Sequence, residues 1–215
     1  MKENYQKIME EMLKNIDGQT LLLHSCCAPC SSYVIGLLSN YFKITIFYYN
    51  PNISPYEEYQ KRVEEQIRFI NELDTKYKVD FIEVDYEHEE FLNIVEGLEN
   101  EKEGGKRCFK CYHQRLEKTA EFAKANKYDY FCTTLSVSPY KNAQKLNEIG
   151  KLLEEQYNIK YLYSDFKKQN GYLNSIKFSK EYNLYRQDYC GCEFSLIQKN
   201  NDSIVEKERD DKIKN

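Results

Sequence analysis

Short apolar runs alternate with longer amphipathic stretches along most of the chain, and this alternation constrains the fold more than any other feature. The apolar runs predict five strands, at residues 20–25, 43–49, 79–84, 128–133 and 160–163. The stretches between them carry apolar residues at helical spacing and predict helices at residues 30–40, 55–73, 87–98, 109–126 and 142–157. The order βαβαβααβαβ predicts an α/β fold with a doubly wound, five-stranded parallel sheet covered by helices on both faces.

The length of the chain, 215 residues, suits one well-packed domain, which we expect to span residues 1–198. The pattern becomes irregular after the fifth strand. This predicts a small helical extension over residues 164–198 that folds back over the edge of the sheet. Residues 199–215 are mostly charged and polar and are expected to form a flexible tail.

The composition of the chain limits the cellular compartment and the classes of binding partner that we expect. No stretch approaches the roughly 20 apolar residues of a membrane span, and the N-terminal segment lacks the apolar core of a signal peptide, so we expect a cytoplasmic protein. The net charge of -4 provides no overall attraction to nucleic acid, which would need a local basic patch. Because the cytosol keeps thiols reduced, the eight cysteines indicate metal ligands or redox groups rather than structural disulfides.

The cysteines fall into four groups: Cys26-Cys27-x-x-Cys30, Cys108-x-x-Cys111, the single Cys132, and Cys190-Gly191-Cys192. The first group directly follows the first strand, where ligands bind in doubly wound sheets. The second lies at the start of a helix, where both sulfurs share one turn. Two such pairs provide four soft ligands, which suit either tetrahedral zinc or a [4Fe-4S] cluster. Adjacent cysteines after a strand, and further thiols left over, favour a redox site.

Two cysteines separated by one glycine can close only a small ring. Glycine eases the backbone strain of such a ring, and strained disulfides are easily reduced, so Cys190 and Cys192 are interpreted as a redox dithiol. The alternatives are two further metal ligands or thiols that never pair. Cys132 lies inside a predicted buried strand and is given no chemical role.

Five segments together resemble the cobalamin-independent epoxyqueuosine reductases, the QueH family. They read LLHSCCAPCS, YYNPNISPYEEYQKR, RCFKCYHQRLEKTAEFA, FCTTLSVSPYKN and YRQDYCGCEFS. The resemblance implies a fold related to the HUP-type nucleotide-binding domains of the PP-loop ATPases, with a cysteine loop in place of the phosphate-binding loop. It also implies an oxidoreductase that converts epoxyqueuosine in tRNA to queuosine, the last step of queuosine synthesis.

The same resemblance implies roles for seven thiols. Four would hold a [4Fe-4S] cluster: Cys26, Cys27, Cys108 and Cys111. Two would form a redox-active disulfide: Cys190 and Cys192. Cys30 would bind an additional mononuclear iron or remain a thiol near the substrate. Removing the epoxide oxygen as water takes two electrons and two protons. Zinc has no redox chemistry, so the resemblance favours iron and sulfide over zinc.

Other residues are candidates for handling the substrate. Asp188 and His24 are candidate proton donors, although a salt bridge for Asp188 and a buried strand position for His24 explain them equally well. The loops after the second and fourth strands offer amides and hydroxyls for a polar modified base, through Asn50, Asn52, Ser138 and Tyr140. Turn formation and helix capping are the alternative explanation for these loops.

A tRNA partner would contact basic residues gathered in patches. The candidates are Lys106, Arg107, Lys110, His113, Arg115, Lys141, Lys145, Lys167, Lys168, Lys177, Lys180 and Arg186. The modified base would be splayed out of the anticodon loop to reach a recessed site. An electron donor is a further partner, of unknown identity. Two other functions fit the cysteines: a zinc-stabilised nucleic-acid-binding module, and a general thiol-disulfide or electron-transfer protein.

Overall fold

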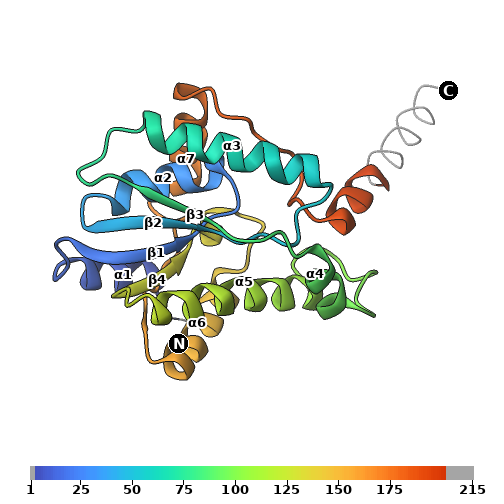
Figure 1. Cartoon of the computed structure of the whole chain (residues 1–215), viewed down its shortest axis with the longest axis horizontal. Coiled ribbons are helices and arrows are strands. Elements are labelled where there is room, and N and C mark those ends of the chain that lie inside the picture. The colour runs from blue at the N-terminus through green and yellow to red at the C-terminus, as the bar shows by residue number, and fades with distance from the viewer. Residues whose placement is uncertain (1–2, 202–215) are drawn as a thin grey trace.

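A computed structural model describes residues 3–201 and contains a five-stranded sheet in which all neighbouring strands run parallel, in the order β3-β2-β1-β4-β5 (Figure 1). The strands are β1 (Gln19–His24), β2 (Phe42–Tyr48), β3 (Asp80–Glu83), β4 (Tyr130–Thr133) and β5 (Lys160–Tyr161). The predicted α/β fold and parallel sheet are therefore confirmed. Of the expected tail at 199–215, residues 202–215 lie outside the described residues.

Strand β1 is the central strand and is buried on both faces. Leu21 and Leu23 belong to the core cluster on one side of the sheet, whereas Leu22 belongs to the cluster on the other side. Successive side chains of a strand point to opposite faces. A strand that is covered on both faces therefore carries apolar residues at consecutive positions. The leucines ahead of the cysteine loop thus place that loop at the middle of the sheet.

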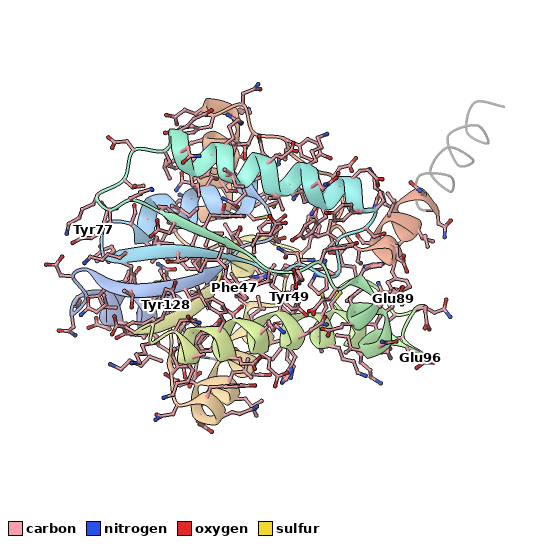
Figure 2. The ribbon with its side chains drawn as sticks, in the orientation of Figure 1. Phe47, Tyr49, Tyr77, Glu89, Glu96 and Tyr128 are labelled. Atoms are coloured by element: carbon pink, nitrogen blue, oxygen red, sulfur yellow. The ribbon has the colours of Figure 1, made fainter. Side chains whose placement is uncertain are left out.

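Helices cover both faces (Figure 1). On one side lie α2 (Ala28–Leu38), α3 (Tyr56–Glu72) and α7 (Gly171–Glu181); on the other lie α4 (His88–Val95), α5 (Lys106–Ala125) and α6 (Ala143–Tyr157). Helix α1 (Tyr5–Leu13) precedes the sheet, the 3-10 turn η1 (Thr134–Val137) follows β4, and residues 193–201 are helical. Phe47, labelled in Figure 2, packs on Phe122 of α5 with ring centroids 4.9 Å apart and ties that helix to the sheet.

Two helices begin earlier than predicted. Helix α2 starts at Ala28, because Pro29 lies in its first turn, where a missing N–H costs no hydrogen bond. Helix α5 starts at Lys106 after the N-cap Gly105, so Cys108 and Cys111 both lie on its first turns. In the other direction, β5 ends at Tyr161, two residues short of the prediction.

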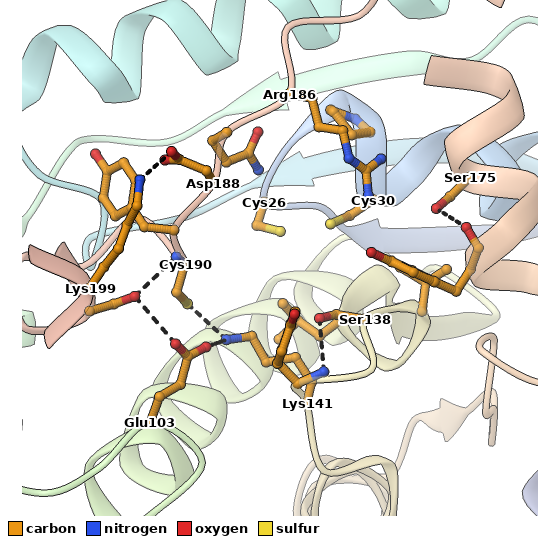
Figure 3. Close-up of a pocket in the computed structure, with 18 of the residues that line it drawn as sticks. Cys26, Cys30, Glu103, Ser138, Lys141, Ser175, Arg186, Asp188, Cys190 and Lys199 are labelled. Atoms are coloured by element: carbon orange, nitrogen blue, oxygen red, sulfur yellow. Dashed lines mark hydrogen bonds and ion pairs between the residues drawn. The ribbon is translucent and has the colours of Figure 1, made fainter. Parts of the chain in front are cut away.

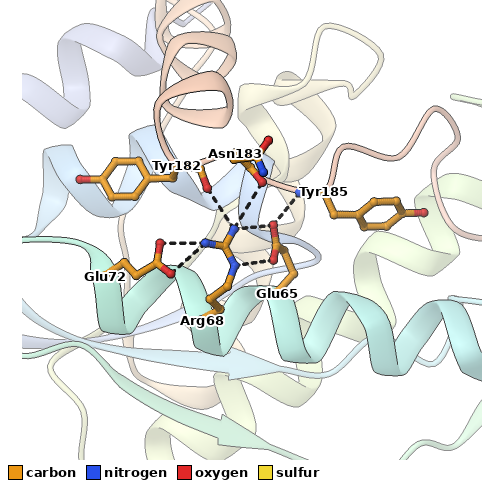
Figure 4. A network of polar contacts seen from close by, with 6 residues as sticks. All are labelled: Glu65, Arg68, Glu72, Tyr182, Asn183 and Tyr185. Carbon is orange, nitrogen blue, oxygen red and sulfur yellow. Dashed lines mark hydrogen bonds and ion pairs between the residues drawn. The ribbon is translucent and has the colours of Figure 1, made fainter.

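The C-terminal extension differs from the prediction in its position. Helix α7 packs mainly on α2, with the ring of Phe178 against Gly36, rather than folding over the edge of the sheet. The chain then crosses α3, where Arg68 donates hydrogen bonds to the carbonyl oxygens of Tyr182 and Asn183 (Figure 4). Glu65 of α3 accepts from the backbone N–H of Tyr185, so the segment that leads to Cys190 is fixed on α3.

Among the residues that the structure describes, no helix combines the length and the apolar composition needed to cross a membrane.

Candidate redox and metal site

The loop between β1 and α2 gathers three thiols. The sulfurs of Cys26, Cys27 and Cys30 all lie within 4.8 Å of one another, and those of Cys26 and Cys27 are 3.8 Å apart. Cys27 is the N-cap of α2 and has an extended backbone, so the helix begins directly after it. Cys26 and Cys27 are buried and Cys30 is half-buried. Hydrogen bonds from Cys26 and Cys30 hold the pKa of Cys27 well below its usual range.

The second pair lies on α5. Cys108 and Cys111 are buried, and burial raises the pKa of both, to about 11 for Cys111. Cys108 belongs to the same packed cluster as Cys26 and Cys27. Its sulfur also accepts a hydrogen bond from the N–H of Gly104 at 3.2 Å. The close group of three sulfurs found among the described residues does not include either cysteine of α5.

The Cys190-Gly191-Cys192 turn is shaped by its glycine. Gly191 has φ +112°, and a Cβ there would lie 2.8 Å from Nη1 of Arg62. Arg62 Nη1 donates to the carbonyl oxygen of Cys190 at 3.3 Å, and the N–H of Ser54 donates to that of Gly191 at 2.9 Å. The turn is thus held by backbone contacts that leave no room for a side chain at its centre.

The two thiols of this turn have different surroundings. Cys190 is half-buried and Cys192 is buried. The hydrogen bond from Cys192, together with the charges of Lys141 and Arg115, holds the pKa of Cys190 well below its usual range although burial opposes this. The hydrogen bond with Cys190 and burial raise the pKa of Cys192. These surroundings favour the thiolate form at Cys190 and the protonated form at Cys192.

A cavity of about 700 Å³ is lined by cysteines of the first loop and of the Cys190 turn, whereas Cys108 and Cys111 are not part of its lining. Six of the candidate thiols, proton donors and substrate contacts line it: Cys26, Cys30, Ser138, Tyr140, Asp188 and Cys190. All of these except Tyr140 are labelled in Figure 3. They come from loops after β1 and β4 and from the segment after α7. The side chain of Tyr140 is 74% exposed and lies at the rim.

Asn50, Asn52 and His24 lie outside this lining. Asn50 and Asn52 are buried, and Asn50 donates to the carbonyl oxygen of Ser25 at 2.8 Å, so it supports the cysteine loop from behind. His24 is fully buried, with Nδ1 2.9 Å from Oγ1 of Thr133 and Nε2 3.2 Å from the carbonyl oxygen of Tyr49. Burial lowers its pKa to about 3, so it is a neutral strand histidine.

Asp188 lies at the exposed rim of the cavity. Its carboxylate pairs with Lys199, and the hydrogen bond from Lys199 holds the pKa of Asp188 below its usual value. At neutral pH it is therefore ionised, and its role as a proton donor stays a prediction that requires a proton to reach it first.

Four charged residues lie near the thiols: Arg62, Glu103, Arg115 and Lys141. The sequence predicted no contact between these residues and the cysteines. Both guanidinium groups are buried, and each has an Nη2 without a partner among the described residues. The charge of Arg115 acts on Cys111, Cys190 and Cys26, one cysteine from each of three groups. One local signal was available, because Cys111 and Arg115 are four residues apart and share a face of α5.

The predicted basic patch is smaller than expected. Arg107, Arg115 and Lys141 are buried. Arg107 donates to the carbonyl oxygens of Leu98 and Glu99 and so stabilises the loop ahead of α5. Because all three side chains are buried, they do not add to an exposed basic surface.

The arrangement suits a metal centre with thiolate ligands. Thiolates are soft ligands that bind zinc or iron-sulfur clusters. The unpartnered Nη2 groups of Arg62 and Arg115 offer N–H donors beside the thiols, and both guanidinium charges compensate negative charge in a buried site.

Comparison with solved structures agrees with the fold. A solved structure, the U34-tRNA thiolase NcsA from Methanococcus maripaludis with its [4Fe-4S] cluster, superposes with a TM-score of 0.53 over 95% of this chain and 73% of its own, at 13% identity. At that identity the likeness concerns the fold alone.

Sequence relatives are much closer. The profile of the family described as epoxyqueuosine reductase QueH matches residues 21–198. Epoxyqueuosine reductase QueH of Staphylococcus epidermidis is 43% identical over 92% of this chain and 86% of its own. That of Streptococcus pyogenes serotype M1 is 42% identical over 90% of this chain and 78% of its own. The chain therefore belongs to the epoxyqueuosine reductase QueH family.

Proposed function

We propose that this chain reduces epoxyqueuosine in tRNA to queuosine, with a [4Fe-4S] cluster and a redox-active cysteine pair. The observation that carries the proposal is the shared cavity, in which Cys26 and Cys30 from the first loop face Cys190 from the far end of the chain. Loss of the epoxide oxygen as water consumes two electrons and two protons. A site for this reaction needs both an electron source and proton donors next to the substrate.

Four thiols are assigned to the cluster: Cys26, Cys27, Cys108 and Cys111. Their burial, the shared packing of Cys108 with the first loop and the two guanidinium groups support this assignment. When bound, the cluster would supply electrons singly at low potential. Cys30 is half-buried in the cavity, and we assign it either to an additional mononuclear iron or to a free thiol beside the substrate.

The cysteine pair is assigned to two-electron storage. Oxidation of a Cys190 thiolate and a Cys192 thiol to a disulfide releases two electrons and one proton, because Cys190 has already lost its own. The reaction takes up two protons, so one more must come from solvent or from a group such as Asp188 after that group is protonated. An external electron donor then restores the pair.

The rim of the cavity is suited to a base that leaves the anticodon loop. Tyr140 offers an exposed ring for stacking, and Ser138 offers a hydroxyl group. We assign these two residues to direct substrate contact, and Asn50 and Asn52 to support of the loops behind it. The exposed basic residues remaining from the predicted patch include Lys106, Lys110 and Arg186, and these are assigned to tRNA phosphates.

The decisive experiment is anaerobic reduction of tRNA containing epoxyqueuosine by the reconstituted protein, read by nucleoside mass spectrometry. We expect queuosine to form, and expect Cys190→Ser to stop multiple turnover while Cys132→Ser, in a buried strand position, leaves turnover intact. A colourless protein with stoichiometric zinc and no activity would contradict the proposal in favour of a zinc-stabilised module. Reduction of small disulfides without any action on the tRNA would favour a general thiol-disulfide protein.

A further inference from the structure

A buried lysine contacts the exposed member of the cysteine pair. Lys141 is 8% exposed, and its Nζ lies 2.8 Å from Sγ of Cys190 and 2.8 Å from Oε1 of Glu103 (Figure 3). A buried ammonium is costly unless it is paired, and this one is paired with both groups at the wall of the cavity. Ser195 connects the two partners, since its Oγ donates to Glu103 and accepts from the N–H of Cys190.

The backbone of Lys141 also makes hydrogen bonds. Its N–H donates to the carbonyl oxygen of Ser138, and its own carbonyl oxygen accepts from Nζ of Lys167. The next residue, Asn142, is the N-cap of α6 and accepts from the N–H of Lys145. The ammonium is therefore presented to Cys190 from a fixed turn at the start of a helix.

Among residues 3–201, no lysine or arginine acts on Cys192 as Lys141 acts on Cys190. Cys192 is buried in an apolar cluster with Phe91, Val95 and Cys111. The two thiols of one turn thus face different environments, one charged and open to the cavity, the other apolar and enclosed.

We propose that Lys141 is a positioning residue that holds the sulfur of Cys190 toward the cavity in its reactive form, while Glu103 competes with Cys190 for the same ammonium. Cys190 is then the sulfur that reacts first, and Cys192 is the one that completes the disulfide. The proposal rests on the redox role assigned to the pair above. The charged groups that act on Cys190 are Lys141 and Arg115, the titratable groups are Cys192, Cys108, Cys111 and Tyr112, and the carboxylate of Glu103 pairs with Lys141.

The two charges in this contact should affect Cys190 in opposite directions. Removing the ammonium of Lys141 takes away the cation that favours the thiolate. Removing the carboxylate of Glu103 takes away a competitor for that cation. A role in folding alone would make both substitutions act in the same direction.

The test measures iodoacetamide alkylation of Cys190 and Cys192 in the cluster-loaded, reduced protein at neutral pH, by mass spectrometry of the peptide that carries both. In the unchanged protein we expect Cys190 to react much faster than Cys192. Lys141→Gln should slow Cys190 by about tenfold or more, because a nearby opposite charge commonly changes a pKa by one unit or more. Lys141→Arg should restore most of the rate, and Glu103→Gln should keep or increase it.

A matched control is Lys151→Gln, the same charge change at an exposed position of α6, which should leave alkylation of Cys190 unchanged. An unchanged rate in Lys141→Gln, or an equal loss in Lys141→Gln and Glu103→Gln, would overturn the proposal. If Lys141→Gln does not fold, the comparison of Lys141→Arg with Glu103→Gln still decides, since slowing in Glu103→Gln would refute it. Failure of the unchanged protein to reduce epoxyqueuosine, with the alkylation pattern as expected, would refute the proposed function alone.

Discussion

At the residue scale, small differences of environment separate side chains that look equivalent in the sequence. Cys190 and Cys192 are separated by one glycine, yet one faces Lys141 and the cavity and the other an apolar cluster. Asn50 and Ser138 lie in the loops that follow β2 and β4, but of the two only Ser138 lines the cavity. These differences decide which residues can touch a substrate.

Gly191→Ala tests the shape of the cysteine turn. Its φ of +112° disfavours any side chain, and a Cβ would crowd Nη1 of Arg62 at 2.8 Å, so we expect lower stability and loss of multiple turnover. The matched control is Gly97→Ala, where φ is +76° but nothing lies within 4 Å. This control should cost about 1 to 2 kcal/mol from backbone strain and spare turnover. Urea unfolding and the tRNA assay measure both effects, and equal turnover in the two variants would contradict the expectation.

Arg115→Gln tests charge compensation at the metal site. The buried guanidinium acts on Cys26, Cys111 and Cys190, and its loss should weaken cluster binding by about tenfold or more. Iron and labile sulfide per chain, measured at limiting iron, give the result. Lys110→Gln, an equal charge change at an exposed position of the same helix, is the control. Full cluster content in Arg115→Gln would show that the guanidinium does not stabilise the cluster.

At the element scale, the segment between α7 and the cysteine turn depends on a contact with α3. Arg68 is bonded to Glu65 and Glu72 on its own helix and to the carbonyl oxygens of Tyr182 and Asn183 (Figure 4). Exposed ion pairs on their own contribute little. Arg68 also has a second role, because its hydrogen bonds to the carbonyl oxygens of Tyr182 and Asn183 connect α3 to the segment after α7.

Arg68→Ala should loosen this segment. We expect unfolding to cost about 1 kcal/mol less and trypsin to cut after Arg186 faster, because two backbone acceptors lose their donor. The control is Lys14→Ala, which removes an exposed ion pair with Glu11 within one turn of chain and should change neither measurement. Unchanged proteolysis in Arg68→Ala would mean that other contacts hold the segment.

The same network predicts a pH dependence. Hydrogen bonds from Arg68 lower the pKa of Glu65 from 4.5 in the folded state, so folding favours the ionised form. This contribution is complete above pH 4.5 and is lost as the pH falls through the lower folded value. Urea unfolding at several acidic pH values should therefore show a smaller loss of stability on acidification in Glu65→Gln than in the unchanged protein. An identical loss of stability in the two proteins would show that carboxylates other than Glu65 determine the stability at acidic pH.

At the scale of the whole molecule, topology places the site. The sheet order β3-β2-β1-β4-β5 has its reversal of winding at β1 and β4, and the loops after these strands carry the first cysteines and the turn before Lys141. Ligands bind at this edge in doubly wound sheets. The segment after α7 provides further lining residues of the cavity, among them Asp188 and Cys190.

The expectation that residues 1–198 form one domain stays a prediction at this scale. If it holds, urea unfolding followed by tyrosine fluorescence and by far-ultraviolet circular dichroism should give a single, coincident transition. The protein without its cluster and the loaded protein should each show this, at different midpoints, because bound metal stabilises only the folded state. Separate transitions for the two probes would indicate an independent C-terminal extension.

The sequence by itself determined the class of fold, the order of strands and helices, and the position of the first cysteines after the central strand. These follow from hydrophobic period and residue spacing, which are local properties. Even so, strand and helix ends differed from the prediction, since β5 pairs through only two residues and α5 begins at Lys106 rather than at Phe109.

Only the tertiary structure decided which charges meet the thiols. Lys141 and Cys190 are 49 residues apart, and Arg62 and Cys190 are 128 apart, so no spacing rule joins them. In the sequence Arg115 and Lys141 resemble ordinary solvent-facing charges, and the fold buries both. These pairs form only when elements that are distant in the sequence pack together. A buried charge is unfavourable unless an oppositely charged or hydrogen-bonding partner lies next to it.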